Sequence, residues 1–187
     1  MESENHRLDI INVAGLMIGK GHGDGLERAL RDQTYVRSVR TVYPTPPSKS
    51  MEDPEKSVER ANGQVLIALE EIRKEFGDSN AVLIGRSYGG LMAPTVACHM
   101  GFKDILKSIS IEAPLHPDVK VESPKLLPIL AVCADHYKKR PAMAAETVRM
   151  LEELGTQRVV VISNRRDSIV PPEAQVLPGD FFMLDLD

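Results

Sequence analysis

Residues 80–101, NAVLIGRSYGGLMAPTVACHMG, place a single serine between glycines at the end of an apolar run. Residues 81–85 are short, continuous and apolar, which predicts a buried strand, and a helix is expected to follow to about Gly101. Ser87 therefore stands at a sharp turn from strand to helix. The turn has two interpretations: the serine caps the helix, or its hydroxyl is raised above the sheet edge as a nucleophile.

The glycines around Ser87 help to choose between these interpretations. Gly85 and Gly89 lie two positions before and two positions after the serine, where a side chain is expected to collide with a neighbouring strand or helix. Gly90 adds another position of close packing. The order of strand, glycines and helix favours the nucleophile, because a Gly-x-Ser-x-Gly string carries this meaning only in that context.

The rest of the chain alternates strands and helices. Apolar runs at 7–15, 35–44, 108–114 and 158–163 predict strands. Residues 123–141 are ambiguous, either a strand or a helix that begins at Pro124. Wholly apolar strands between helices predict an α/β fold: one domain over 1–187 with a mostly parallel sheet and helices on both faces. Two helices are expected from apolar positions at spacings of three and four, over 53–77 (Val58, Ala61, Val65, Leu69, Ile72, Phe76) and before 158 (Ala144, Val148, Leu151, Leu154).

Composition narrows the function classes. Apolar residues make up 42% of the chain and charged residues 27%, as in ordinary globular proteins. The net charge of −4 and the scattered lysines and arginines give no reason to expect a nucleic-acid partner. Two cysteines form neither a disulfide framework nor a zinc set. The sequence has no His, Cys, Asp or Glu cluster at ligand spacing, so no metal or organic cofactor is expected. No apolar run approaches a membrane span, and the polar start has no apolar signal region. We therefore expect a cytoplasmic protein.

The string GRSYGG, with the strand before it and the helix after it, resembles the nucleophile elbow of the α/β-hydrolase superfamily. The resemblance covers the strand and helix order as well, and so most of the chain. It implies a small serine esterase or lipase-like hydrolase with a Ser–acid–His triad in that chain order, and with Ser87 as nucleophile. It also implies an oxyanion hole of two backbone amides. One amide would be that of Tyr88, and the other that of Leu16 or Met17 in the loop after the first strand.

Two aspartates compete for the role of the acid. In VVVISNRRDSIVPPEA, a strand, a short loop and Asp-x-x-Val-Pro resemble the triad-acid turn of the superfamily, with Asp167 as the acid. The alternative is an Asp that only caps a turn before the prolines. Asp135 would end a strand in a similar way if 123–141 were a strand. The intervening helix and the Val-Pro pair favour Asp167.

The histidine of the triad is missing from its expected place, because no histidine follows His136. Three explanations are open: truncation at the C-terminus before the histidine and the last helix, a base from elsewhere such as His116 or His136, or a pseudo-hydrolase. We favour truncation, since it accounts for the missing histidine and the missing helix together. His22 and His99 are expected to lie in a loop and on a helix surface.

The glycine-rich segment GLMIGKGHGDG, residues 15–25, fails as a phosphate-binding loop. One residue too few separates its first glycine from Gly19-Lys20, and Gly21 stands where Ser or Thr should be. It also fails the dinucleotide pattern. His22 and the glycine after it resemble the His-Gly oxyanion motif of some esterases, but a flexible loop beside the active-site mouth is favoured.

These patterns predict a serine hydrolase acting on an ester, thioester or related acyl bond of a small molecule. Residues 114–141 could form a small lid, and Arg86 could meet either an anionic substrate group or an internal carboxylate. The competing hypotheses are a catalytically degenerate binding or regulatory protein on the same fold, and an acyltransferase. The sequence does not indicate the oligomeric state or the acyl chain.

Overall fold

The computed structural model describes residues 7–15, 24–44, 54–119, 127–167, 169–178 and 182–186. Within them, six strands form one sheet in the order β2-β1-β3-β4-β5-β6, and every neighbouring pair is parallel. The expected α/β class with a parallel sheet is therefore confirmed. The strands are β1 (Leu8–Val13), β2 (Val36–Val42), β3 (Ala81–Arg86), β4 (Ile105–Ile111), β5 (Val159–Asn164) and β6 (Phe182–Leu186).

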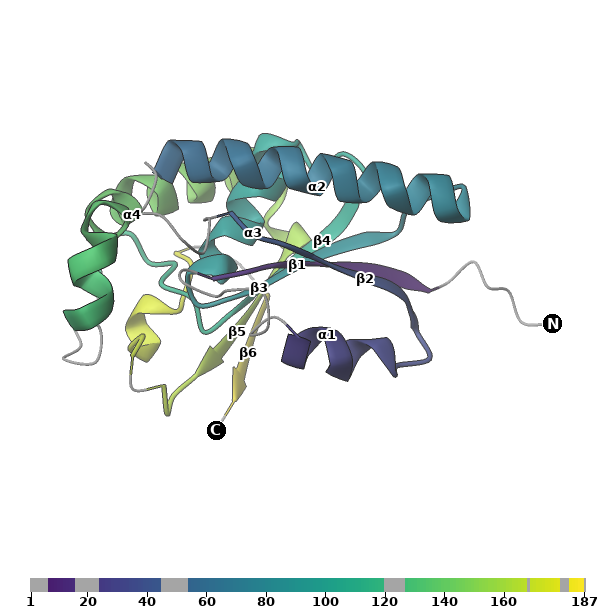
Figure 1. The fold of residues 1–187 in the computed structure, drawn as a ribbon. Helices are drawn as coiled ribbons and strands as arrows, with labels where there is room; N and C mark the ends of the chain where they lie inside the picture. Colours follow the sequence, from purple (N-terminus) through teal and green to yellow (C-terminus); the bar gives the residue numbers. More distant parts are fainter. Residues whose placement is uncertain are drawn as a thin grey trace.

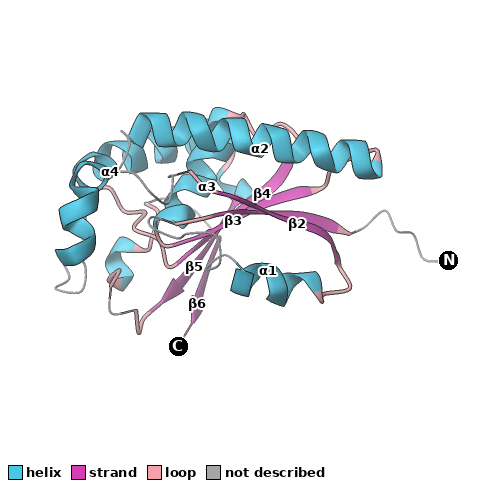
Figure 2. Cartoon of the chain, viewed as in Figure 1, coloured by secondary structure: helices cyan, strands magenta, loops and turns pink. Residues whose placement is uncertain are grey.

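Helices lie on both faces of this sheet (Figure 1; Figure 2). On one face lie α2 (Pro54–Phe76), α3 (Tyr88–His99) and α4 (Leu127–Leu154), and on the other lies α1 (Asp24–Arg31). Because all strands are parallel, their carboxyl ends meet at one edge of the sheet, and the turns that follow β3, β4 and β5 are neighbours there.

The core has two parts, one on each face of the sheet. The larger cluster packs the sheet against α2, α3 and α4, with Ile11, Leu69, Leu83, Leu91 and Leu151 at its centre. A smaller cluster of strand residues lies on the opposite face and contacts Leu30 of α1. The expected apolar positions of α2 are buried from Val58 to Ile72, and those of α4 are buried or partly buried, so both predicted helices are confirmed.

The structure corrects several boundaries. Residues 127–141 are the first half of α4, so the strand interpretation of 123–141 is wrong. Phe76, expected in the core, is exposed at the end of α2, where the Arg37 guanidinium lies over its ring. The strand predicted at 108–114 begins at Ile105 and ends at Ile111, because Glu112 has a positive φ of 47° that stops it. Helix α1 was not expected.

Within the described residues, no helix combines the length and the apolar character that crossing a membrane requires. On β6, the side chains of Leu184 and Leu186 are exposed.

Candidate active site

Ser87 occupies the turn between β3 and α3 in a strained backbone conformation. Its φ is 55° and its ψ is −129°, a combination that costs a residue with a side chain of order 1–3 kcal/mol. Its amide donates a hydrogen bond of 2.9 Å to the carbonyl oxygen of Ile111 on the neighbouring strand. The Ser87 hydroxyl makes no capping bond to α3 and no other hydrogen bond to a described residue. The capping interpretation is therefore wrong.

The glycines around this turn are required by close approach of backbone. A Cβ on Gly85 would lie within 3.0 Å of the carbonyl oxygen of Gly89, and a Cβ on Gly89 within 3.0 Å of that of Val13. A Cβ on Gly90 would lie 2.6 Å from the Cβ of Ala113. The predicted collisions are confirmed at all three positions. They allow α3 to begin directly against the ends of β1 and β3.

A buried carboxylate that the sequence analysis did not single out lies beside this turn. Glu112 follows β4, is 7% exposed and has a positive φ. Its Oε2 accepts a hydrogen bond of 2.5 Å from Nε of Arg86, and its Oε1 accepts one of 2.7 Å from Nδ2 of Asn164. Arg86 thus pairs with an internal carboxylate, the second of its two predicted roles. The sequence signal that could have identified Glu112 is a charged residue at the end of an apolar strand.

Asp167 lies in the loop after β5, where its Oδ1 accepts hydrogen bonds of 2.7 and 3.2 Å from the amides of Ile169 and Val170. It therefore caps a turn, as the alternative interpretation held. Its Oδ2 has no hydrogen-bond partner among the described residues. Among the described residues, the half-buried carboxylate is thus held at one oxygen only.

Gln175 ties this acid loop to the end of β5. Its side chain is fully buried. Its Oε1 accepts a 2.7 Å bond from the amide of Asn164, while Nε2 donates to the carbonyl oxygens of Asn164 at 3.1 Å and Val170 at 2.6 Å. Through Asn164, the acid loop is joined to Glu112 and so to the serine turn.

Ser87 and Asp167 share the carboxyl edge of the sheet but do not bond to each other. They follow β3 and β5, which are separated by β4, so about 10 Å lies between the two strands at about 4.8 Å each. Asp135 was the competing candidate for the acid on the premise that it ends a strand. That premise is wrong, because Asp135 lies within α4. Its side chain is outside the described part.

The expected oxyanion donors are only partly described. Tyr88 is the first residue of α3 and its side chain is buried. Leu16 and Met17 lie outside the described residues, as do His22 and most of the glycine-rich segment. Strand β1 also ends at the carboxyl edge of the sheet, beside the serine turn, because Gly89 packs against Val13.

Two histidines have described side chains. His99 is exposed on α3, as predicted. His116 follows β4 by five residues at the carboxyl edge, and its Nδ1 accepts a 3.2 Å bond from the amide of Asp118. Neither histidine bonds to Ser87 or Asp167. The side chain of His136, in α4, lies outside the described part. Among the described residues, no three His, Cys, Asp or Glu side chains are grouped as metal ligands would be.

Together, the parallel sheet, the strained serine turn and the glycine contacts define an α/β-hydrolase fold, and solved structures agree. One of the metagenome-derived lipolytic enzymes LipS and LipT is 15% identical with a TM-score of 0.64, over 97% of this chain and 84% of that one. A soluble variant of monoglyceride lipase from Saccharomyces cerevisiae is 12% identical with a TM-score of 0.66, and the match covers 98% of this chain and 78% of that one. Paleococcus ferrophilus monoacylglycerol lipase is 15% identical with a TM-score of 0.54, and the match covers 95% of this chain and 83% of that one.

At these identities the likeness concerns the fold alone. No protein-family model matches the sequence, and no curated protein matches it.

Proposed function

We propose that this protein is a serine hydrolase that cleaves an ester, thioester or related acyl bond in a small molecule, and that it works in the cytoplasm. One observation carries the proposal. Ser87 adopts a conformation that residues with side chains rarely adopt, and its hydroxyl, at the carboxyl edge of the sheet, makes no hydrogen bond to any residue that the structure describes. Strain of this kind persists where the surrounding structure enforces it, and it clusters at active sites.

The proposed reaction has two steps. The Ser87 oxygen attacks the acyl carbon and gives up its proton to a base, and the alcohol or thiol leaves with a proton. Water then adds to the acyl-enzyme, which releases the acid and restores the hydroxyl. The amide of Tyr88 and that of Leu16 or Met17 would hold the negative oxygen of each tetrahedral intermediate. Losing one such donor typically slows the reaction about 10²–10³-fold.

Asp167 is the proposed acid, and its Oδ2, which bonds to no described residue, is the atom that would orient a histidine. Of the two histidines with described side chains, His116 is the one at the same sheet edge as Ser87. Its Nδ1 already accepts a bond from Asp118, which leaves Nε2 as the donor in the neutral ring. His116 would therefore have to break this bond before it could serve as the base.

Selectivity would come from the segment after β4. Residues 114–119 are fixed to α4 by Arg140, which is 3% exposed and donates to the carbonyl oxygens of Pro114, His116 and Val119 at 2.6–3.1 Å. The amide of Leu115 also donates 2.7 Å to the carbonyl oxygen of Ala174. In this proposal, any lid within 114–141 hinges beyond these anchors. The monoacylglycerol lipase and the monoglyceride lipase among the solved neighbours make acyl esters sensible first substrates.

A fluorophosphonate probe tests the proposal, because it reacts with a serine only when that serine is activated. We expect labelling of the unaltered chain at Ser87, located by peptide mass spectrometry, and none in Ser87→Ala. Ser79→Ala, eight residues upstream and before β3, is the matched control and should be labelled normally. Hydrolysis of p-nitrophenyl butyrate should follow the same pattern. Equal labelling of Ser87→Ala, or none in any folded variant, would refute the proposal.

The second candidate is a binding or regulatory protein on the same fold. The observation in its favour is that neither Ser87 nor Asp167 bonds to a histidine among the described residues. This candidate predicts a folded protein that stays unlabelled by the probe and yet is stabilised by an ester analogue.

A further inference from the structure

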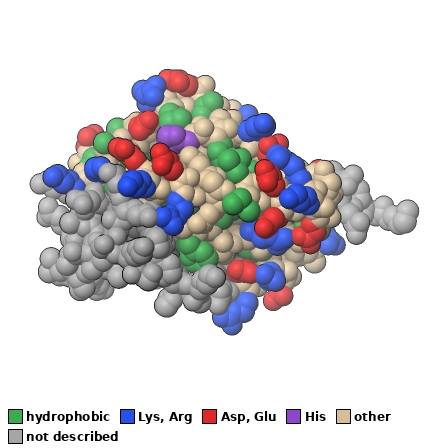
Figure 3. All heavy atoms as spheres, turned by 45° about the horizontal axis from the view of Figure 1, so that its top comes forward, with side chains coloured by type: hydrophobic (Ala, Val, Ile, Leu, Met, Phe, Trp, Pro, Cys, Tyr) green, Lys and Arg blue, Asp and Glu red, His purple; other side chains and the backbone are tan. Residues whose placement is uncertain are grey.

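Glu112 combines two unfavourable features in one residue. Its side chain is a buried carboxylate, and removing an ionised carboxylate from water is costly. Its φ of 47° lies in the left-handed region, which favours glycine. Figure 3 shows acidic and basic side chains mingling on the exposed surface of the helical side of the molecule, where ion pairs contribute little. Glu112 is therefore unlike the ordinary surface charges of this protein.

Stability of the fold does not account for this carboxylate. Replacing a buried ion pair by apolar residues of similar volume is often neutral or stabilising. The side chain of the partner, Arg86, is 70% exposed, so water already solvates much of its charge. A carboxylate, unlike an apolar group or an amide, supplies two acceptor oxygens in a fixed geometry. At Glu112 each of the two oxygens serves a different strand end.

On the side of the nucleophile, Glu112 and the residue before it hold the serine turn at two successive positions. Oε2 of Glu112 accepts the 2.5 Å hydrogen bond from Nε of Arg86, the residue directly before Ser87. The carbonyl oxygen of Ile111 accepts the bond of 2.9 Å from the Ser87 amide. The end of β4 therefore fixes the backbone that carries the proposed nucleophile.

On the side of the acid, the contact runs through Asn164. Oε1 of Glu112 accepts 2.7 Å from Nδ2 of Asn164. The carbonyl oxygen of Asn164 accepts 3.1 Å from the amide of Asp167, and its Oδ1 accepts 2.9 Å from the amide of Arg166. Asn164 thus begins the turn that carries Asp167. Because both oxygens of Glu112 are occupied, Glu112 could orient a histidine only by giving up one of these contacts.

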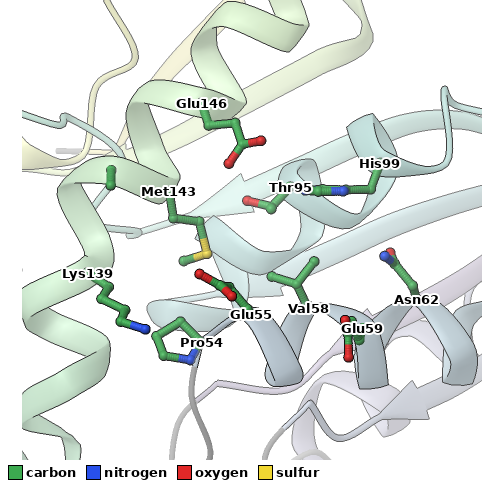
Figure 4. Close-up of a pocket in the computed structure, with 11 residues that line it drawn as sticks. Pro54, Glu55, Val58, Glu59, Asn62, Thr95, His99, Lys139, Met143 and Glu146 are labelled. Atoms are coloured by element: carbon green, nitrogen blue, oxygen red, sulfur yellow. The ribbon is translucent and has the colours of Figure 1, made fainter.

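Arg86, Glu112 and Asn164 form what we call the strand-end link, and it does not pass through the helices. A cavity of about 480 Å³ lies between α2, α3 and α4 (Figure 4). None of the three residues of the link lines this cavity. Glu146 lines it and is exposed, so Glu146→Gln is a control for effects that pass through the helices.

We propose that Glu112 is a positioning residue that sets the separation between the serine turn and the loop of Asp167. The consequence for catalysis rests on the proposed hydrolase function, in which a base must reach both Ser87 and Asp167. A displacement of about 1 Å at a reacting group can cost about 10²-fold in rate. Breaking the link therefore lowers kcat and leaves KM largely unchanged.

Asp9 provides a matched control for the loss of a buried carboxylate. It is 0% exposed and accepts hydrogen bonds from Arg37, so Asp9→Asn removes a buried, arginine-bonded charge just as Glu112→Gln does. Asp9 pairs with Ala81 on β3. Ala81 lies six residues before Ser87, which corresponds to about 20 Å at about 3.3 Å per residue.

Kinetics with p-nitrophenyl butyrate separate a positioning role from a structural one. Each variant is measured where urea unfolding shows it to be folded. We expect Glu112→Gln to lower kcat about 10–100-fold while KM changes by less than about twofold. The rate of fluorophosphonate labelling at Ser87 should fall in parallel. Asp9→Asn and Glu146→Gln should keep kcat within about twofold of the unaltered chain.

Amide NMR tests the link without any activity. Among the described residues, Asn164 bonds to Glu112 but not to Arg86 or Ser87. Asn164→Ala should nevertheless shift the amide resonances of Ser87 and Tyr88. The same substitution should leave them nearly unmoved in a Glu112→Gln background, because the link is already broken there. This comparison is a double-mutant cycle read at a distant site.

Three results would overturn the positioning role: equal losses of kcat in Glu112→Gln and Asp9→Asn, a loss that falls on KM instead of kcat, or Ser87 and Tyr88 amides that respond to Asn164→Ala equally in both backgrounds or in neither. If the folded, unaltered chain shows neither hydrolysis nor labelling, the proposed function fails. The amide shifts then decide alone whether Glu112 joins the two loops.

Discussion

Replacing Gly89 by alanine tests the geometry of the serine turn. An ordinary helix start and a start packed against β1 predict changes of opposite sign in the free energy of unfolding. Gly89 lies in the first turn of α3. In an ordinary helix, alanine is more favourable than glycine by about 1 kcal/mol, so the substitution would stabilise the protein if the turn were unremarkable. The contact with β1 predicts the opposite result.

The magnitude follows from what the new methyl group would meet. Its position lies within 3.0 Å of the carbonyl oxygen of Val13. Val13 is fully buried in β1, and Ala14 after it donates its amide to Val42 at 3.0 Å, so this backbone cannot move cheaply. Overpacking typically costs about 1–3 kcal/mol, sometimes more. At the upper end of this range, about 3 kcal/mol, less the gain of about 1 kcal/mol for alanine in a helix, we expect a net loss of about 2 kcal/mol and a Tm lower by about 4–8 °C for a domain of this size.

Urea unfolding of both forms measures the difference, with Gly63→Ala as the control. Gly63 lies within α2, and nothing lies within 4 Å of the position that a Cβ would take there. Its replacement should therefore stabilise the protein by about 1 kcal/mol. If Gly89→Ala proved as stabilising as Gly63→Ala, α3 would not begin against β1, and the structural argument for Ser87 would fail.

Three further predictions concern titration, the acid loop and the thiol. Burial alone would raise the pKa of Asp9, but hydrogen bonds, chiefly from Arg37, outweigh it and lower the pKa. The carboxylate therefore stabilises the fold above about pH 4, and this contribution is lost as the pH falls through the folded-state pKa. Urea unfolding of Asp9→Asn should vary less between pH 5 and 3; an unchanged slope would contradict this. Gln175→Ala should cost about 2–4 kcal/mol by leaving buried backbone groups unpaired, with faster amide exchange around Asp167; unchanged exchange there would separate Gln175 from the acid loop. Burial raises the pKa of the Cys98 thiol to about 12, so iodoacetamide at pH 8 should label Cys98 only in urea; labelling in the native protein would show the thiol to be accessible.

The fold could be predicted from the sequence because its signals are local. The apolar run of 81–85 and the spacing of the α2 positions report burial directly, and each proved to be a core element. Phe76 fitted the same spacing but is the last residue of the helix, where its ring is exposed and contacts Arg37. Residues 127–141 were ambiguous because an apolar run alone does not distinguish a buried strand from a helix.

The serine turn was predictable for a related reason, since three glycines within six residues record the close approach of other backbone. Glu112 was not predictable in the same way. Its role depends on Arg86 and Asn164, which are 26 and 52 residues away in sequence. The pairing exists only once β3, β4 and β5 lie side by side.

These long-range bonds have a consequence for the proposed catalysis. Arg86, Glu112 and Asn164 join the ends of three adjacent strands, and Gln175 extends the connection to the loop of Asp167. The serine turn and the acid loop are therefore joined by one chain of polar contacts that runs through the buried Glu112 and Gln175, although Ser87 and Asp167 make no hydrogen bond to each other. Such a chain is costly if any member is left unsatisfied. Its presence at the edge where Ser87 lies is explained if the two loops must keep a fixed separation, which is what a base placed between them would require.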